Sequence, residues 1–292
     1  MPGERPWPRS RAVLALAALV AAAAPLRGHD LWLVPSSFAP EPGAKVSVRI
    51  LVGDGPGEGR PLAPRPGWIE RFVVAGPGGE APVATVAGSD PAGYAGLGGP
   101  GVYSVGLESG DTLHTLSAER FARFLAEEGL EEAAAALSAA EAGPVRELFS
   151  RSVKSLLRVG GGAASAGGVA APEPGTTLGL ELELVPVSDP FDPGSPELAL
   201  RVLRRGEPAA GVLVEAVRLT GAGTGGAVAS SAVSDRRGRV RLPLTGAGAG
   251  SGGDGTDRAS GGWLVTAVAL ERAPPGSGAD WRSLWASLTF ER

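Results

Sequence analysis

Short apolar runs separated by glycine and proline are the feature that most restricts the fold of this chain. The 292 residues include 46 glycines and 26 prolines, and these cluster between the apolar runs. In the run 45–52, KVSVRILV, valine and isoleucine alternate with polar residues, which is the pattern of a half-buried β-strand. Such runs recur at short intervals with turn residues between them. The sequence therefore predicts a mainly β protein of many short strands.

Residues 29–159 are expected to form an amino-terminal β domain of the sandwich type. Beyond the first run, its strand candidates are 68–77, 81–88 and 101–109. Each candidate is bounded by glycine or proline, as strands that end in tight turns are.

A helical pattern interrupts the strands over about residues 117–158. Ser117 is a candidate N-cap, and Gly129 is placed to end a first helix. In the following segment PVRELFSRSVKSLLRVG, Pro144 suits the first turn of a second helix. The residues that would share one face of that helix are Val145, Leu148, Phe149, Ser152 and Leu156. A helical hairpin between two β regions is therefore predicted.

The second predicted helix carries three charged residues, Glu147, Arg151 and Lys154. Glu147 precedes Arg151 by four residues, which predicts an ion pair on the surface of the helix. A buried ionic cluster of all three residues against the sheet is the alternative.

Residues 160–175, GGGAASAGGVAAPEPG, are predicted to be a flexible linker. Beyond it, residues 176–292 contain about seven strand candidates with turn signals between them, typical of an immunoglobulin-like or transthyretin-like Greek-key sandwich. Asp235 and Gly238 stand at the first and fourth positions of SDRRG, which suits a type I turn. The predicted fold is thus mainly β, with two antiparallel β-sandwich domains and a helical hairpin between them.

Residues 1–28 have the pattern of a secretory signal peptide, in which arginines precede an alanine-rich apolar stretch. Small residues favour cleavage either after Gly28 or within 21–24, and cleavage after Gly28 would leave His29 as the first residue. The apolar stretch is shorter than the roughly 20 residues that span a bilayer. We therefore expect no transmembrane anchor after signal cleavage, and a periplasmic or secreted mature protein.

Composition excludes several classes of function. The chain contains no cysteine, so it must be stable without disulfides and lacks a cysteine nucleophile. Its formal net charge is −4, and loss of a leader with four arginines and one glutamate would make it −7. This charge and the absence of a basic patch argue against nucleic acid as a partner. No Gly-x-Ser-x-Gly motif is present, and we expect a protein that is not an enzyme.

The two histidines, His29 and His114, are the candidate metal ligands. If His29 is the mature terminus, its amine and one imidazole nitrogen can chelate one ion, a pairing that suits Cu(II) or Ni(II). Asp30 can add a carboxylate oxygen, and His114 can complete the set if its strand folds back near the terminus. Ordinary surface roles for both histidines are the alternative, since such residues are common without a ligand role.

The order of several segments resembles one known family. These segments are HDLWLVPSSF, FARFLAEEGL, ELFSRSVKSLLRVG, LELELVPVSDPF, SDRRGRVRLPL, GGWLVTAVAL and WRSLWASLTFE. Together they resemble a bacterial exported family of unknown function that is often labelled a periplasmic component of nickel or cobalt uptake. The chain departs from that family near 269–270, where members commonly carry a histidine.

The second half also resembles the carboxypeptidase-regulatory-like sandwich, through Gly206-Glu207-Pro208, Gly211 to Val214 and Asp235 to Gly238. These motifs are structural.

Two functions stay open at this point. The resemblance and the histidines favour an exported binding or accessory protein that handles one divalent transition metal ion (nickel, cobalt or copper) with a membrane transporter or envelope protein as partner. The other is a structural or envelope-interaction protein that binds a protein or glycan without metal. A copper oxidase of the histidine-brace type needs His114 beside His29, which nothing in the spacing indicates.

Overall fold

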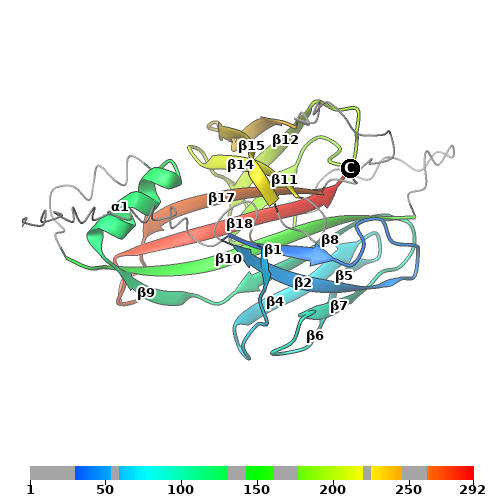
Figure 1. Cartoon of the computed structure of the whole chain (residues 1–292), viewed down its shortest axis with the longest axis horizontal. Helices are drawn as coiled ribbons and strands as arrows, with labels where there is room; N and C mark the ends of the chain where they lie inside the picture. Colours follow the sequence, from blue (N-terminus) through cyan, green and yellow to red (C-terminus); the bar gives the residue numbers. More distant parts are fainter. Residues whose placement is uncertain (1–29, 54–58, 131–142, 161–176, 220–224, 245–261) are drawn as a thin grey trace, which may run out of the picture.

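The structure, a computed structural model, describes residues 30–53, 59–130, 143–160, 177–219, 225–244 and 262–292. The expected leader, His29 and all of the expected linker except Gly160 lie outside the described residues. The described chain is mainly β and forms three sheets (Figure 1). Within these ranges, no helix combines the length and the apolar character needed to cross a bilayer.

The strands are divided among sheets A, B and C. Sheet A contains β1 (Asp30–Pro35), β2 (Lys45–Gly53), β3 (Arg60–Pro61), β6 (Ala84–Thr85) and β7 (Gly93–Gly96). Sheet B contains, in spatial order, β15 (Gly225–Val233), β14 (Leu213–Leu219), β17 (Gly262–Arg272), β18 (Trp281–Glu291), β10 (Val145–Val159), β8 (Gly101–Ser109), β4 (Ile69–Gly76) and β5 (Gly79–Pro82), and β9 (Thr112–Leu116) also pairs with β10. Sheet C contains β11 (Leu182–Pro186), β12 (Glu197–Arg204), β13 (Glu207–Pro208) and β16 (Arg239–Pro243).

Strands β10 and β18 form a parallel pair at the centre of sheet B, in register from Glu147 opposite Trp281 to Ser155 opposite Thr289. The two long ribbons lie side by side in Figure 1. All other pairings among the described strands are antiparallel. Because β10 precedes the expected linker and β18 follows it, one continuous sheet crosses the boundary that the sequence suggested between two domains.

Sheets A and C cover opposite faces of sheet B. Neighbouring residues of a strand point to opposite faces. On β10, Val153 and Leu157 join the core beneath sheet A, whereas Leu156 joins the core beneath sheet C. On β18, Leu288 and Phe290 also point into the core beneath sheet C. The central strands are therefore buried on both faces.

Strand β1 lies across β18 on the sheet A side. The hydroxyl of Ser287 donates to the carbonyl of Leu31 at 2.7 Å, and that of Thr289 donates to the carbonyl of Leu33 at 2.8 Å. Both hydroxyls are buried, so each bond satisfies a polar group that burial would otherwise leave unpaired. These two contacts fix the start of the described chain over the central strand.

The predicted helical hairpin is wrong in its second half. Residues 145–159 form strand β10, although their apolar residues recur at helical spacing. A strand that is buried on both faces does not show the alternation of polar and apolar residues that reveals a half-buried strand. Polar residues on β10 are instead buried against individual partners, which mimics a helix with a polar side.

The first predicted helix is confirmed as α1 (Ala118–Glu127). Ser117 caps its start, where Oγ accepts a hydrogen bond from the backbone N–H of Arg120 at 3.3 Å. Gly129 has a φ of +65°, and the N–H of Leu130 donates to the carbonyl of Leu125, which ends the helix in a Schellman-type turn. The buried face of α1 packs with Val145, Val268, Trp281 and Trp285 of sheet B.

A buried ion pair joins the two halves of the chain. Nζ of Lys154 on β10 lies 2.8 Å from Oε1 of Glu183 on β11, and their side chains are 1% and 2% exposed. Glu183 also accepts hydrogen bonds from the backbone N–H groups of 178–180. Burial lowers the pKa of Lys154, and the neighbouring Glu183 opposes this shift. A carboxylate with this many donors is well satisfied in the interior.

The predicted type I turn at Asp235 and Gly238 is confirmed. The N–H of Gly238 donates to the carbonyl of Asp235 at 2.8 Å, and the Asp235 carboxylate accepts from the N–H groups of Arg237 and Arg239. The turn places Gly238, with a φ of +71°, against the carbonyl of Val202.

Candidate functional site

His114 lies on β9, directly opposite Glu147 of β10. Its Nε2 is 2.6 Å from Oε2 of Glu147. The histidine side chain is 40% exposed, whereas that of Glu147 is only 3% exposed. With Glu147 ionised, the proton of a neutral His114 sits on Nε2, and the lone pair of Nδ1 is left available. A half-exposed imidazole held by a buried carboxylate is a common arrangement of a metal-binding histidine.

Glu147 is itself held by the strand that runs parallel to β10. Its Oε1 accepts a hydrogen bond from the hydroxyl of Ser283, which in turn accepts one from Nε1 of Trp285 at 2.9 Å. The ring of Phe149 packs near the imidazole of His114, with centroids 5.0 Å apart. The orientation of His114 is therefore set by a short hydrogen-bonded chain that begins in the core.

Arg151 is buried on the same face of β10 as Glu147. Its guanidinium lies 4.1 Å from the ring centroid of Trp285 and 5.4 Å from that of Phe149. Burial lowers the pKa of Arg151 to about 10, while the charges of Asp30, Glu147 and Glu128 act in the opposite direction. Aromatic faces and nearby carboxylates are the surroundings that a buried guanidinium requires.

The predicted cluster of Glu147, Arg151 and Lys154 is buried, so the expected surface pair on a helix is wrong. The three side chains do not form one cluster, however. Glu147 and Arg151 point toward α1 and β1, while Lys154 points to the opposite face and pairs with Glu183. The alternation of a strand separates residues that a helix would have brought together.

Asp30 is the first described residue and begins β1, where it pairs with Gly53 of β2. Asp30, Arg151 and Trp285 line the same small cavity. Asp30 and His114 therefore approach the same face of β10. Their neighbours on that strand, Arg151 and Glu147, are four residues apart, which is about 13 Å along a strand.

The predicted ligand set is brought together only in part. His29 lies outside the described residues. In the part of the chain that the structure describes, no group of three histidine, aspartate or glutamate side chains is arranged to hold a metal ion. The described chain thus supplies one oriented imidazole, from His114, on the face where β1 begins.

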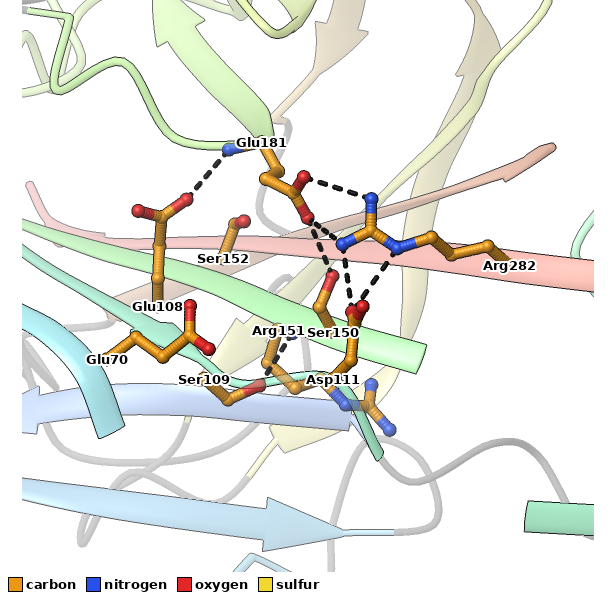
Figure 2. A pocket seen from close by; sticks show the side chains of 9 residues that line it. All are labelled: Glu70, Glu108, Ser109, Asp111, Ser150, Arg151, Ser152, Glu181 and Arg282. Atoms are coloured by element: carbon orange, nitrogen blue, oxygen red, sulfur yellow. Dashed lines mark hydrogen bonds and ion pairs between the residues drawn. The ribbon is translucent and has the colours of Figure 1, made fainter. Parts of the chain in front are cut away.

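A second polar site lies on the other side of β10, in a cavity of about 230 Å³ (Figure 2). It opens where β8 ends and β9 begins along the edge of β10. Its lining residues are Glu70, Glu108, Ser109, Asp111, Ser150, Arg151, Ser152, Glu181 and Arg282. Sequence analysis missed this site, because its residues come from distant segments, such as Asp111 and Arg282, which are 171 residues apart, and no local motif links them.

Arg282 forms ion pairs with two carboxylates of this cavity. Figure 2 shows Asp111 and Glu181 both pointing at its guanidinium, with Nη2 at 2.8 Å from Asp111 and 2.6 Å from Glu181. Glu181 also accepts from the hydroxyl of Ser150 at 3.1 Å. These contacts connect β18, β10 and the segment before β11, so the cavity marks a junction where the two halves of the chain meet.

Glu108 lies across the cavity from Arg282. Its Oε1 accepts the backbone N–H of Glu181 at 2.8 Å, and its Oε2 is 3.9 Å from Nη1 of Arg71. Burial raises the pKa of Glu108, and the hydrogen bond from Glu181 and the charge of Arg71 offset only part of this shift.

Comparison with protein families gives a match that covers more than half of the chain. A family model described as Domain of unknown function (DUF4198) matches residues 26–249. No curated protein matches the chain. The matched range begins before β1 and extends beyond β16, so it includes strands of sheets A, B and C together with α1 and His114.

Proposed function

We propose that this chain, which belongs to the DUF4198 family of domains of unknown function, is a non-enzymatic, exported protein that captures a divalent transition metal ion. The proposal is based on the geometry of the site around His114. Nickel, cobalt and copper are the candidate ions, and the ion is cargo rather than a resident cofactor. In this proposal the amine and imidazole of His29 chelate the ion, and His114 supplies a further nitrogen. The partner would be a membrane transporter or envelope protein to which the ion is passed in the periplasm.

The observation that carries the proposal is the contact between His114 and Glu147. Metal-binding histidines almost always give their second ring nitrogen to a carboxylate or carbonyl group, which fixes the tautomer and raises the basicity of the ligand. Glu147 is buried and is held by Ser283, so it presents a fixed carboxylate to a half-exposed imidazole.

The position of β1 supports the same proposal. Hydroxyls of Ser287 and Thr289 hold β1 across β18, and Asp30 shares a cavity with Arg151 on the His114 face of β10. If the mature chain begins at His29, its amino terminus lies one residue before Asp30, the first residue of β1. Chelation by a terminal amine and an imidazole nitrogen suits the tetragonal sites that Cu(II) and Ni(II) prefer.

The arrangement of the sheets also belongs to the proposal. We infer two sandwich-like units that share sheet B, one beneath sheet A and one of the carboxypeptidase-regulatory-like type beneath sheet C. The two separate cores support this description. In it, the strands act as a rigid scaffold for the ion at the start of β1.

The test is native mass spectrometry of protein exported with its own leader and isolated without chelators. We expect a mature mass that begins at His29 and one retained ion. Titration with Ni(II) and Cu(II) should then show that one extra residue before His29 and His114→Ala each weaken binding at least about tenfold. Leu113→Ala, which changes the exposed neighbour of His114, is the matched control.

Equal affinity in the extended chain would overturn the amino-terminal chelate. A metal-free protein that also fails to bind either ion in titration would overturn the whole proposal, and would favour an envelope-interaction protein that works without metal.

A further inference from the structure

The start of β1 approaches the buried guanidinium of Arg151. Asp30 and Arg151 line one small cavity together with Leu31, Val153, Trp285 and Ala286. Arg151 is 9% exposed, and its guanidinium lies 4.1 Å from the centroid of the Trp285 ring. An arginine this deeply buried is destabilising unless carboxylates or other acceptors surround it.

We propose that Asp30 docks the start of β1 onto Arg151, and is a positioning residue for the amino terminus rather than a metal ligand. Only the statement that Asp30 is not a metal ligand rests on the proposed metal function. In this proposal the Asp30 carboxylate stays beside the guanidinium as its counter-charge, and it would have to leave that position in order to bind an ion.

The charges around Arg151 are consistent with this assignment. Against the effect of burial, which lowers the pKa of Arg151, the charges of Asp30, Glu147 and Glu128 each raise it. Glu147 already accepts from Ser283 and lies 2.6 Å from His114. Glu128 follows the last turn of α1. Arg151 is thus the point at which the start of β1, the end of α1 and the His114 pair come together.

Hydrogen exchange of the metal-free, full mature chain tests the docking directly. We expect Asp30→Asn and Arg151→Met each to speed amide exchange of residues 31–33 at least about tenfold. The double variant should exchange no faster than the faster single variant, because both changes remove one interaction. Methionine keeps apolar contact with Trp285 but removes the charge.

A matched control comes from the same strand. Arg158 on β10 pairs with Asp189 at 2.9 Å, and its guanidinium lies 4.6 Å from the ring centroid of Phe191, but this pair is exposed and lies on the sheet C face of β10, opposite to β1. Arg158→Met and Asp189→Asn should leave exchange of 31–33 unchanged. If Arg151→Met does not fold, Arg151→Lys and Asp30→Asn are compared instead. Residues 31–33 should exchange more slowly in Arg151→Lys, which keeps the positive charge, than in Asp30→Asn.

Two results would overturn the proposal. One is unchanged exchange of 31–33 in Asp30→Asn, and the other is additive effects in the double variant. Titration with Cu(II) then separates positioning from ligation. Positioning predicts that both single variants lose affinity by a similar factor, whereas ligation by Asp30 predicts a loss in Asp30→Asn and a gain or no change in Arg151→Met. If no variant binds Cu(II), the proposed function fails while the exchange result still decides the docking.

Discussion

His114 and Glu147 occupy opposed positions on β9 and β10, and the buried member of the pair is the carboxylate. The two residues are 33 positions apart in the chain, yet their side chains meet at 2.6 Å. The buried Glu147 therefore orients a half-exposed imidazole. Four residues further along β10, Arg151 is buried beneath the start of β1.

Replacing Glu147 with glutamine should weaken metal binding about tenfold to hundredfold. The amide nitrogen of glutamine donates to Nε2 of His114, which moves the imidazole proton to Nδ1 and removes the lone pair an ion requires. Titration with Ni(II) measures the effect. Glu119→Gln on the exposed face of α1 serves as the control. Equal affinity in Glu147→Gln would show that His114 does not act through this carboxylate.

Replacing Lys154 with methionine should lower the free energy of unfolding by about 3 kcal/mol or more. The substitution leaves the buried Glu183 carboxylate without its cation, although three backbone N–H groups still donate to it. Urea denaturation measures the change. Arg158→Met breaks an exposed ion pair on the same strand and should cost at most about 1 kcal/mol. Similar losses in the two variants would contradict a special role for the buried pair.

The raised pKa of Glu108 predicts a defined effect of pH. Between the ordinary value of 4.5 and the raised value, the native state binds more protons than the unfolded state, so the stability from this group falls as pH rises. Glu108→Gln removes this dependence and keeps an oxygen to accept the N–H of Glu181.

The unfolding free energy of Glu108→Gln relative to wild type should therefore be higher at pH 7 than at pH 4. Urea melts across this range measure the difference, with the exposed Glu41→Gln as control. A difference that is constant with pH would contradict the shift.

Two glycines with similar backbone angles separate the effect of strain from that of packing. Gly238 and Gly211 have φ values of +71° and +72°, so alanine is strained at both positions. A Cβ at Gly238 would lie 2.4 Å from the carbonyl oxygen of Val202, whereas one at Gly211 would meet open space. We expect Gly238→Ala to lower the free energy of unfolding by about 1 kcal/mol more than Gly211→Ala does. Thermal melts would contradict this if the two variants lost equal stability.

Local signals in the sequence predicted those parts of the fold that local contacts decide. The cap at Ser117, the end of α1 at Gly129 and the turn at Asp235 all depend on residues within a few positions of one another. The alternation in 45–52 likewise predicted β2, because only one face of that strand is consistently buried. These elements needed no knowledge of distant partners.

Strand β10 could not be predicted in this way. Its buried polar residues are satisfied by partners that lie 29 to 136 positions away, such as Glu183 for Lys154 and Ser283 for Glu147. Without those partners, the polar positions imitate the exposed side of a helix. The candidate site has the same limit. The sequence identified His114 and Glu147 separately, but it contained no local sign that they pair with each other, or of the cavity around Arg282.

The parallel pairing of β10 with β18 also determines the order in which the molecule can mature. Glu147 on β10 lies opposite Trp281 on β18, which is synthesised 134 residues later. Until then one edge of β10 has unsatisfied backbone groups, and parallel pairing of strands so far apart in the sequence is slow. The two halves are therefore expected to acquire their final structure in a single late step. Until β18 has been synthesised, the chain is expected to remain incompletely folded.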